Sequence, residues 1–98
     1  MIEVRQTRDF QSWATSLRDP VAKARIAARI DRVRRGNLGD VKAVGNGVSE
    51  LRIDHGPGYR LYFVQRGAVV VILLCGGDKG SQSQDIAEAK AMAEDLEN

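Results

Sequence analysis

Two arginines stand at matching places in successive segments of alternating hydrophobicity, Val48–Asp54 and Tyr59–Gln65. Side chains of a strand alternate between two faces. An antiparallel register that gathers the apolar side chains on one face therefore places Arg52 and Arg60 together on the other. Because guanidinium groups bind phosphate through a planar fork, the pair predicts a phosphate clamp. A merely solvated sheet face is the alternative, and the glycine-rich turn His55–Gly58 between the segments favours a site.

A second candidate is the stretch LLCGGDKGSQ, Leu73–Gln82. A nucleotide-binding P-loop has glycine, four residues and then Gly-Lys-Ser/Thr before a helix. Here Lys79 precedes its glycine, and the strand before it is expected in an antiparallel sheet, so a P-loop is excluded. Gly76 and Gly77 would permit close backbone approach, and Lys79 supplies charge before a helix N-terminus. The stretch therefore predicts a weaker phosphate site beside Arg60.

The elements that must position these residues follow from the spacing of apolar side chains. Met1–Gln6 alternates as a strand, and helices follow the capping signals Thr7 and Asp19-Pro20. A last helix follows Ser81–Gln84, a serine–glutamine capping box. Period-two patterns predict strands at 41–44, 48–54, 59–65 and 68–75, the last apolar throughout and therefore central. The prediction is an α+β fold of order β-α-α-β-β-β-β-α, with a twisted antiparallel sheet packed by two N-terminal helices and a C-terminal helix.

Composition indicates one globular domain over residues 1–98, with 43% hydrophobic and 29% charged residues. No run approaches the length of a membrane span, and the start lacks an apolar signal core, so we expect a cytoplasmic protein with no membrane contact. One cysteine and one histidine exclude an internal disulfide and argue against a structural metal site. Cys75 is expected to be a buried small hydrophobe. No cofactor is expected.

Charge is distributed unevenly along the chain. Residues 1–66 hold thirteen basic and seven acidic residues, a net charge of +6, whereas residues 67–98 hold two and six, a net of −4. Arg25, Arg29 and Arg32 form a stripe on the second helix beside its apolar face. The stripe is compatible with a solvated helix face or with a surface for nucleic acid or an acidic partner.

Three motifs in series point to a family. They are Glu50-Leu51-Arg52-Ile53, then Gly56-Pro57-Gly58-Tyr59-Arg60-Leu61-Tyr62-Phe63, then Leu73–Gln82 followed by Asp85-Ile86-Ala87. Together they resemble the "addiction module killer protein" branch of the RelE/ParE toxins, close to HigB, over essentially the whole chain. The resemblance implies the toxin of a bacterial type II toxin–antitoxin system. It further implies a metal-independent endoribonuclease that cleaves mRNA on the ribosome and is silenced by a helix-turn-helix antitoxin.

The resemblance also assigns roles. Arg60, Lys79 and Arg52 would be catalytic, stabilising the charge on the pentacoordinate phosphate that forms when a 2′-hydroxyl attacks its neighbour. The residues expected to bind substrate are Lys42, Tyr59, Tyr62, Ser81 and Gln82. Some RNase relatives carry a tyrosine where this chain has Asp85, so the proton-transfer group stays open among His55, Asp78 and Asp85.

Two other functions fit the same resemblance. The RelE/ParE fold also serves toxins that bind and poison DNA gyrase, and a fold can persist after catalysis is lost. A gyrase-binding toxin and a non-catalytic member therefore remain alternatives to the ribonuclease.

Overall fold

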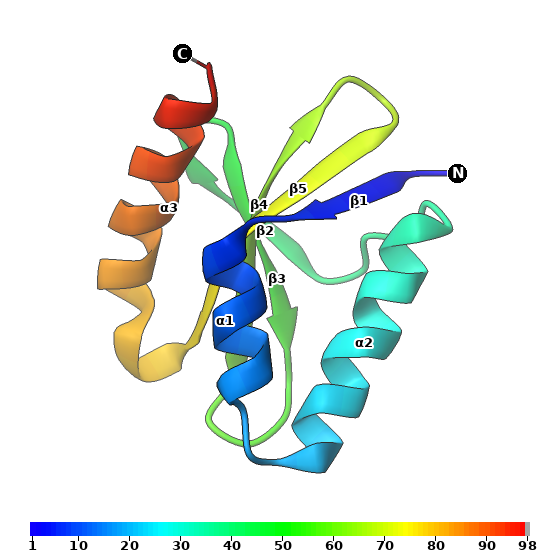
Figure 1. The fold of residues 1–98 in the computed structure, drawn as a ribbon, viewed down its shortest axis with the longest axis vertical. Helices are drawn as coiled ribbons and strands as arrows, with labels where there is room; N and C mark the ends of the chain where they lie inside the picture. The colour runs from blue at the N-terminus through cyan, green and yellow to red at the C-terminus, as the bar shows by residue number, and fades with distance from the viewer. Residues whose placement is uncertain (98) are drawn as a thin grey trace.

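The computed structural model describes residues 1–97 and contains five strands, three α-helices and one short 3₁₀ turn in that range (Figure 1). In chain order these are β1 (Glu3–Gln6), α1 (Arg8–Ser16), α2 (Pro20–Arg34), β2 (Val41–Gly45), β3 (Val48–Ile53), β4 (Tyr59–Arg66), β5 (Val70–Asp78), η1 (Lys79–Ser81) and α3 (Gln82–Glu97). The α+β class and the order of strands and helices agree with the sequence prediction.

The sheet is mixed, which corrects the prediction of a wholly antiparallel one. Its strand order is β1-β5-β4-β3-β2, with β2 to β5 antiparallel in succession and β1 parallel to β5. Alternation in the first six residues predicts a strand but carries no information about its partner or direction. β5 is an interior strand, as its continuous apolar run predicts, because it has β4 on one side and β1 on the other.

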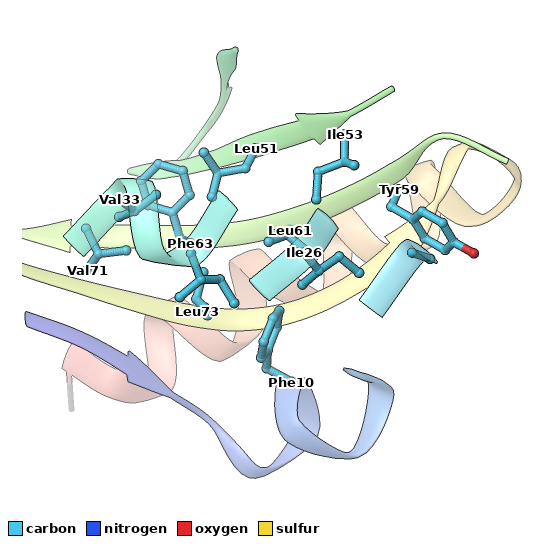
Figure 2. Close-up of a cluster of buried hydrophobic side chains, with 12 residues drawn as sticks. Phe10, Ile26, Val33, Leu51, Ile53, Tyr59, Leu61, Phe63, Val71 and Leu73 are labelled. Carbon is cyan, nitrogen blue, oxygen red and sulfur yellow. The ribbon is translucent and has the colours of Figure 1, made fainter. Parts of the chain in front are cut away.

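Helices cover both faces of the sheet. One core cluster gathers the side chains that α1, α2 and the sheet bury together, with Phe10 and Ile26 facing Leu61 and Leu73 (Figure 2). The second cluster lies on the opposite face under α3 and consists of Val48, Tyr62, Val64, Leu74, Cys75, Ala89 and Ala93. Figure 1 shows α2 and α3 on opposite sides of the sheet. The face that carries Arg52 and Arg60 is therefore partly covered by α3.

The predicted starts of the first two helices are confirmed by their caps. The Thr7 hydroxyl accepts a hydrogen bond from the Phe10 backbone N–H at 3.1 Å. The Asp19 carboxylate accepts one from the Val21 N–H at 2.9 Å, with Pro20 in the first turn. Each cap satisfies a backbone donor that the helix itself leaves free.

The last helix begins at Gln82, directly after Ser81 as predicted, but its capping differs from the prediction. β5 continues through both glycines to Asp78, and the capping box joins Asp78 to Ser81 around η1, so it is not the predicted pair of Ser81 and Gln84. An aspartate is a good capping residue, and Asp78 stands three residues before Ser81, whose side chain forms the reciprocal hydrogen bond of the capping box. None of the helices within residues 1–97 is long and apolar enough to cross a membrane.

Candidate functional site

Arg52 and Arg60 stand directly opposite each other on β3 and β4. Both line one cavity of about 360 Å³, together with Asp40, Asp54, Gly58 and Lys79. Directly opposed residues of an antiparallel pair project from the same face of the sheet. The structure therefore confirms that the two arginines share a face, and it brings Lys79 to the same cavity.

Glu50 is the residue of this site that sequence reasoning missed. Its side chain is 1% exposed, and its Oε2 lies 3.2 Å from the Arg60 Nε. The Arg52 Nε lies 3.9 Å from its Oε1, and the Gln82 Nε2 lies 3.1 Å from both oxygens. Glu50 stands two residues before Arg52, so alternation does place both on one face. The missing information was the burial of Glu50, which α3 produces.

Arg60 is held at two of its three side-chain nitrogens. Its Nε lies close to Glu50 but donates no well-aligned hydrogen bond within residues 1–97, and its Nη1 donates to the Tyr59 carbonyl at 3.2 Å. Gly58 has φ +81°, and a Cβ there would lie 3.5 Å from the Arg60 Nη1. None of these described contacts engages Nη2. The arrangement fixes the plane of the guanidinium and leaves Nη2 for a ligand.

The two glycines near the end of β5 serve a purpose that the sequence did not indicate. A Cβ at Gly76 would lie 2.2 Å from the Trp13 ring, and one at Gly77 would lie 1.8 Å from the Asp85 Oδ2. The space that these glycines leave open is therefore filled by side chains of the protein itself. The expectation that they admit a phosphate to the backbone is wrong. Lys79 does lie exposed beside them, in η1.

Asp85 lies on the same face of the sheet as Arg60. Its carboxylate occupies the space over Gly77, and Gly77 is the register partner of Arg60. The Ser81 hydroxyl donates to the Asp85 Oδ2 at 2.5 Å. Both residues are only partly buried. Asp85 is thus a half-exposed, hydrogen-bonded carboxylate on the same face of the sheet as Arg60, although it does not itself line the arginine cavity.

The other two candidates for proton transfer have structural partners. The Asp78 carboxylate accepts a hydrogen bond from the Gly80 N–H at 2.8 Å as the cap of η1. The His55 Nε2 lies 3.0 Å from the Asp19 Oδ2, and this hydrogen bond is the main cause that lowers the pKa of Asp19. His55 therefore ties the β3–β4 turn to the start of α2 and does not line the arginine cavity.

Neither tyrosine is available to stack on a base. Tyr59 is 8% exposed and packs edge-on to Trp13, with ring centroids 6.1 Å apart. Figure 2 shows it at the end of the core cluster. Tyr62 is fully buried under α3, and burial is the main cause that raises its pKa. Both tyrosines lie on the predicted strand that carries Arg60, but the sequence could not show how completely the helices bury them.

The remaining predicted substrate-binding residues are placed in different ways. Lys42 is exposed on β2 and is the register partner of Glu50, so it projects from the same face as the arginines. Gln82 is committed to Glu50, and Ser81 to Asp85. Of these three, Lys42 alone has a side chain free to approach a ligand directly within the described range.

Cys75 is buried, as expected. Burial raises the pKa of its thiol to about 12, and its Sγ donates to the Asp85 carbonyl at 3.7 Å. A thiol with that pKa is protonated near neutral pH, which excludes it as a nucleophile. Within residues 1–97, no three side chains of His, Cys, Asp or Glu are grouped as a metal site.

The basic stripe of α2 divides into two kinds of arginine. Arg25 and Arg32 are exposed, whereas Arg29 is 9% exposed and donates to three backbone carbonyls. The sequence placed all three at similar positions beside the apolar face. Arg29 differs because the loop after α2 folds back over it.

Comparison with known proteins assigns the chain to a family. The family model described as "Phage derived protein Gp49-like (DUF891)" matches residues 12–96, a range that contains every residue of the site. An uncharacterized protein of Haemophilus influenzae is 50% identical over 95 residues, which cover 97% of this chain and 96% of that protein. The Gp49-like proteins are a phage-derived, RelE-like family of the toxin–antitoxin kind. The chain belongs to this phage-derived Gp49-like family.

Proposed function

We propose that this protein is the toxin of a type II toxin–antitoxin system, of the HigB kind, and that it cleaves mRNA on the translating ribosome in the cytoplasm. One observation carries the proposal. Arg52 and Arg60 are direct cross-strand partners and line one cavity with Lys79. Three cations around a cavity suit a phosphodiester whose negative charge increases during reaction.

The proposed reaction uses groups of the RNA, groups of this chain and solvent water. The 2′-oxygen of a ribose attacks the adjacent phosphorus and loses its proton. The bond from phosphorus to the 5′-oxygen of the next nucleotide then breaks, which leaves a 2′,3′-cyclic phosphate and a 5′-hydroxyl. Arg60, Arg52 and Lys79 stabilise the pentacoordinate phosphate between these steps. The loss of one such donor commonly costs about 2.7–4 kcal/mol of transition-state stabilisation.

Glu50 acts as a positioning residue in this proposal. Its carboxylate lies against the Nε of both arginines and is itself held by Gln82. An Arg side chain engaged through Nε presents its terminal nitrogens in one direction. A preorganised donor of this kind needs no reorientation when charge develops, which is where such sites gain most of their effect.

Asp85 is the proposed general base. It lies over Gly77 beside Arg60, while Asp78 caps η1 and His55 pairs with Asp19. The hydrogen bond from Ser81 fixes its orientation. Asp85 would accept the proton of the 2′-hydroxyl, and water would protonate the leaving 5′-oxygen, since the cavity is open to solvent. Proton transfer of this kind contributes about 10²–10⁴-fold.

An antitoxin must neutralise this site. A cavity with three cations favours a partner that covers it with acidic side chains, and the proposed partner is an antitoxin of the helix-turn-helix type. Lys42, exposed on the same face, would add to the attraction for either the RNA or the antitoxin.

The experiment that tests the proposal adds the purified protein to a translating extract and maps the ends of a reporter mRNA. Cuts within the reading frame that disappear with Arg60→Ala support it. An intact mRNA, together with a supercoiling defect in a plasmid present in the same extract, would instead indicate the gyrase-binding function.

A further inference from the structure

A second basic groove adjoins the arginine cavity. It has a volume of about 300 Å³ and is lined by Arg25, Ala28, Arg29, Arg32, Ile53 and Asp54. Asp54 lines both the groove and the cavity. The two hollows are therefore neighbours that share Asp54, the residue just after β3, as part of their walls.

The outer wall of the groove carries two free cations. Arg25 and Arg32 are exposed and seven residues apart on α2, so they lie on the same side of the helix, about 10.5 Å apart along its axis. No hydrogen bond or ion pair involves either side chain within the described residues. Their charge is consequently available to an external anion.

Arg29 joins the groove rigidly to the cavity. Its Nη1 donates to the Arg52 carbonyl at 2.6 Å, and its Nη2 donates to the Leu38 and Asp40 carbonyls, both at 2.9 Å. Gly39, at φ +69°, makes room for this guanidinium, because a Cβ there would lie 2.8 Å from Nη2. Arg52 and Asp40 line the arginine cavity, so Arg29 fixes α2 relative to that cavity.

Arg29 is also incompletely compensated. Among residues 1–97, its Nε is buried without a hydrogen-bond partner and no carboxylate forms an ion pair with it. Burial is the first cause that lowers the pKa of the guanidinium, and the charge of Arg32 is the second. A phosphate in the groove would offset both effects through its charge, without having to reach Nε.

We propose that the RNA strand passes from the arginine cavity over Asp54 into this groove, where Arg25 and Arg32 bind phosphates that flank the cleaved one. The inference rests on the proposed function, because it extends the path of the same substrate. The Asp54 carboxylate repels phosphate, so the strand crosses this point with a sugar or a base edge towards it. Carboxylates accept hydrogen bonds from base amino groups.

The test measures binding of uncleavable 2′-fluoro RNA, which lacks the attacking hydroxyl, in two lengths. A trinucleotide occupies the cavity alone, and a dodecamer reaches the groove as well. Dissociation constants are measured between 50 and 200 mM salt for the natural chain and for Arg25→Ala/Arg32→Ala. The matched control is Arg5→Ala/Arg8→Ala, which removes one charge on β1 and one at the start of α1, and β1 is at the opposite edge of the sheet from β2.

We expect the salt dependence to change for one combination alone, the dodecamer with Arg25→Ala/Arg32→Ala, which we call the groove variant. Each phosphate contact to a single strand contributes about 0.7 to the slope of log affinity against log salt, so two lost contacts lower the slope by about 1.4. The salt-induced loss of dodecamer affinity then becomes about sevenfold smaller, while trinucleotide binding and the control variant keep their slopes. A dodecamer slope unchanged in the groove variant overturns the inference.

The proposed function is distinguished by one further variant, Arg52→Ala/Arg60→Ala. One outcome is weaker binding of both RNA lengths by this variant together with an unchanged slope in the groove variant. It would support the proposed function and contradict only the role of the groove. If the natural chain binds neither RNA measurably, both the proposed function and the role of the groove are contradicted. Circular dichroism of each variant ensures that the folded protein is compared.

Discussion

The Nε of Arg60 lies 3.2 Å from Oε2 of Glu50, a carboxylate that is almost completely buried beneath α3. A buried ion pair seldom adds net stability, because removing two charges from water costs as much as their attraction returns. The ion pair is better explained by the orientation that it gives to the guanidinium groups. The pair, together with Arg52 and Gln82, orients two guanidinium groups towards an open cavity.

Replacing Glu50 with alanine should destabilise the fold strongly, because Arg60 would remain buried without its counter-charge. The expected loss in the free energy of unfolding is about 3–5 kcal/mol. Thermal unfolding followed by circular dichroism measures it, and Glu50→Leu/Arg60→Met should recover most of the loss, since it removes both charges. A melting temperature within about 2 °C of the natural chain after Glu50→Ala would contradict the ion pair.

A methyl group at Gly76 should disturb the contact between β5 and α1. Its Cβ would lie 2.2 Å from the Trp13 ring, so the indole must move. Overpacking of this kind costs about 1–3 kcal/mol. Urea unfolding of Gly76→Ala measures the cost, and adding Trp13→Leu should return part of it by making room. An additive effect of the two changes would mean that the ring does not occupy this space.

The Asp19–His55 contact predicts a dependence of stability on pH. Because the folded-state pKa of Asp19 lies below 3.8, its unfolded value, the contact stabilises fully above about pH 3.8 and is lost as the pH falls through the folded pKa. Asp19→Asn keeps the helix cap and removes the charge. In urea titrations, the difference in stability between the natural chain and Asp19→Asn should shrink as the pH falls below that point.

His55→Gln provides the control for this prediction, because the His55 hydrogen bond is the largest cause of the shift in Asp19. In that background the shrinking difference at low pH should be much reduced. If the difference in stability depends on pH in the same way with and without His55, the dependence does not come from the Asp19–His55 contact.

Asp85→Asn should lower the rate of mRNA cleavage by about 10²–10⁴-fold if Asp85 is the general base. Ser81→Ala should cost less, since it removes only the hydrogen bond that orients the carboxylate. Initial rates of cleavage in the translating extract separate the two variants, and circular dichroism checks that both are folded. A rate for Asp85→Asn within about tenfold of that of the natural chain would exclude Asp85 as the base.

The sequence predicted what depends on local pattern. The alternation around Arg52 and Arg60 was sufficient to place them on one face, because any register that gathers the apolar residues has that consequence. Thr7 and Asp19 marked helix starts through capping chemistry that operates within three residues. The junction after β5 was located correctly, and Lys79 does reach the cavity.

What the sequence could not predict depends on contacts between distant segments. The burial of Glu50 and Tyr62 requires α3 to cross the sheet, and the role of Gly76 requires Trp13 to lie over it. The direction of β1 was hidden for the same reason, since alternation is the same in parallel and antiparallel pairs. A glycine in a strand indicates close approach, but whether a ligand or a side chain approaches is decided by tertiary packing.

The central claim is that Arg60 stabilises the phosphate during attack by the neighbouring 2′-hydroxyl. The most direct measurement is the chemical state of the RNA ends produced in the translating extract, compared between the natural chain, Arg60→Ala and the exposed control Arg8→Ala. The account predicts 2′,3′-cyclic phosphate and 5′-hydroxyl ends with the natural chain and with Arg8→Ala, and a loss of about 10²-fold or more with Arg60→Ala. Ends carrying 5′-phosphates, or cleavage unaffected by Arg60→Ala, would contradict it.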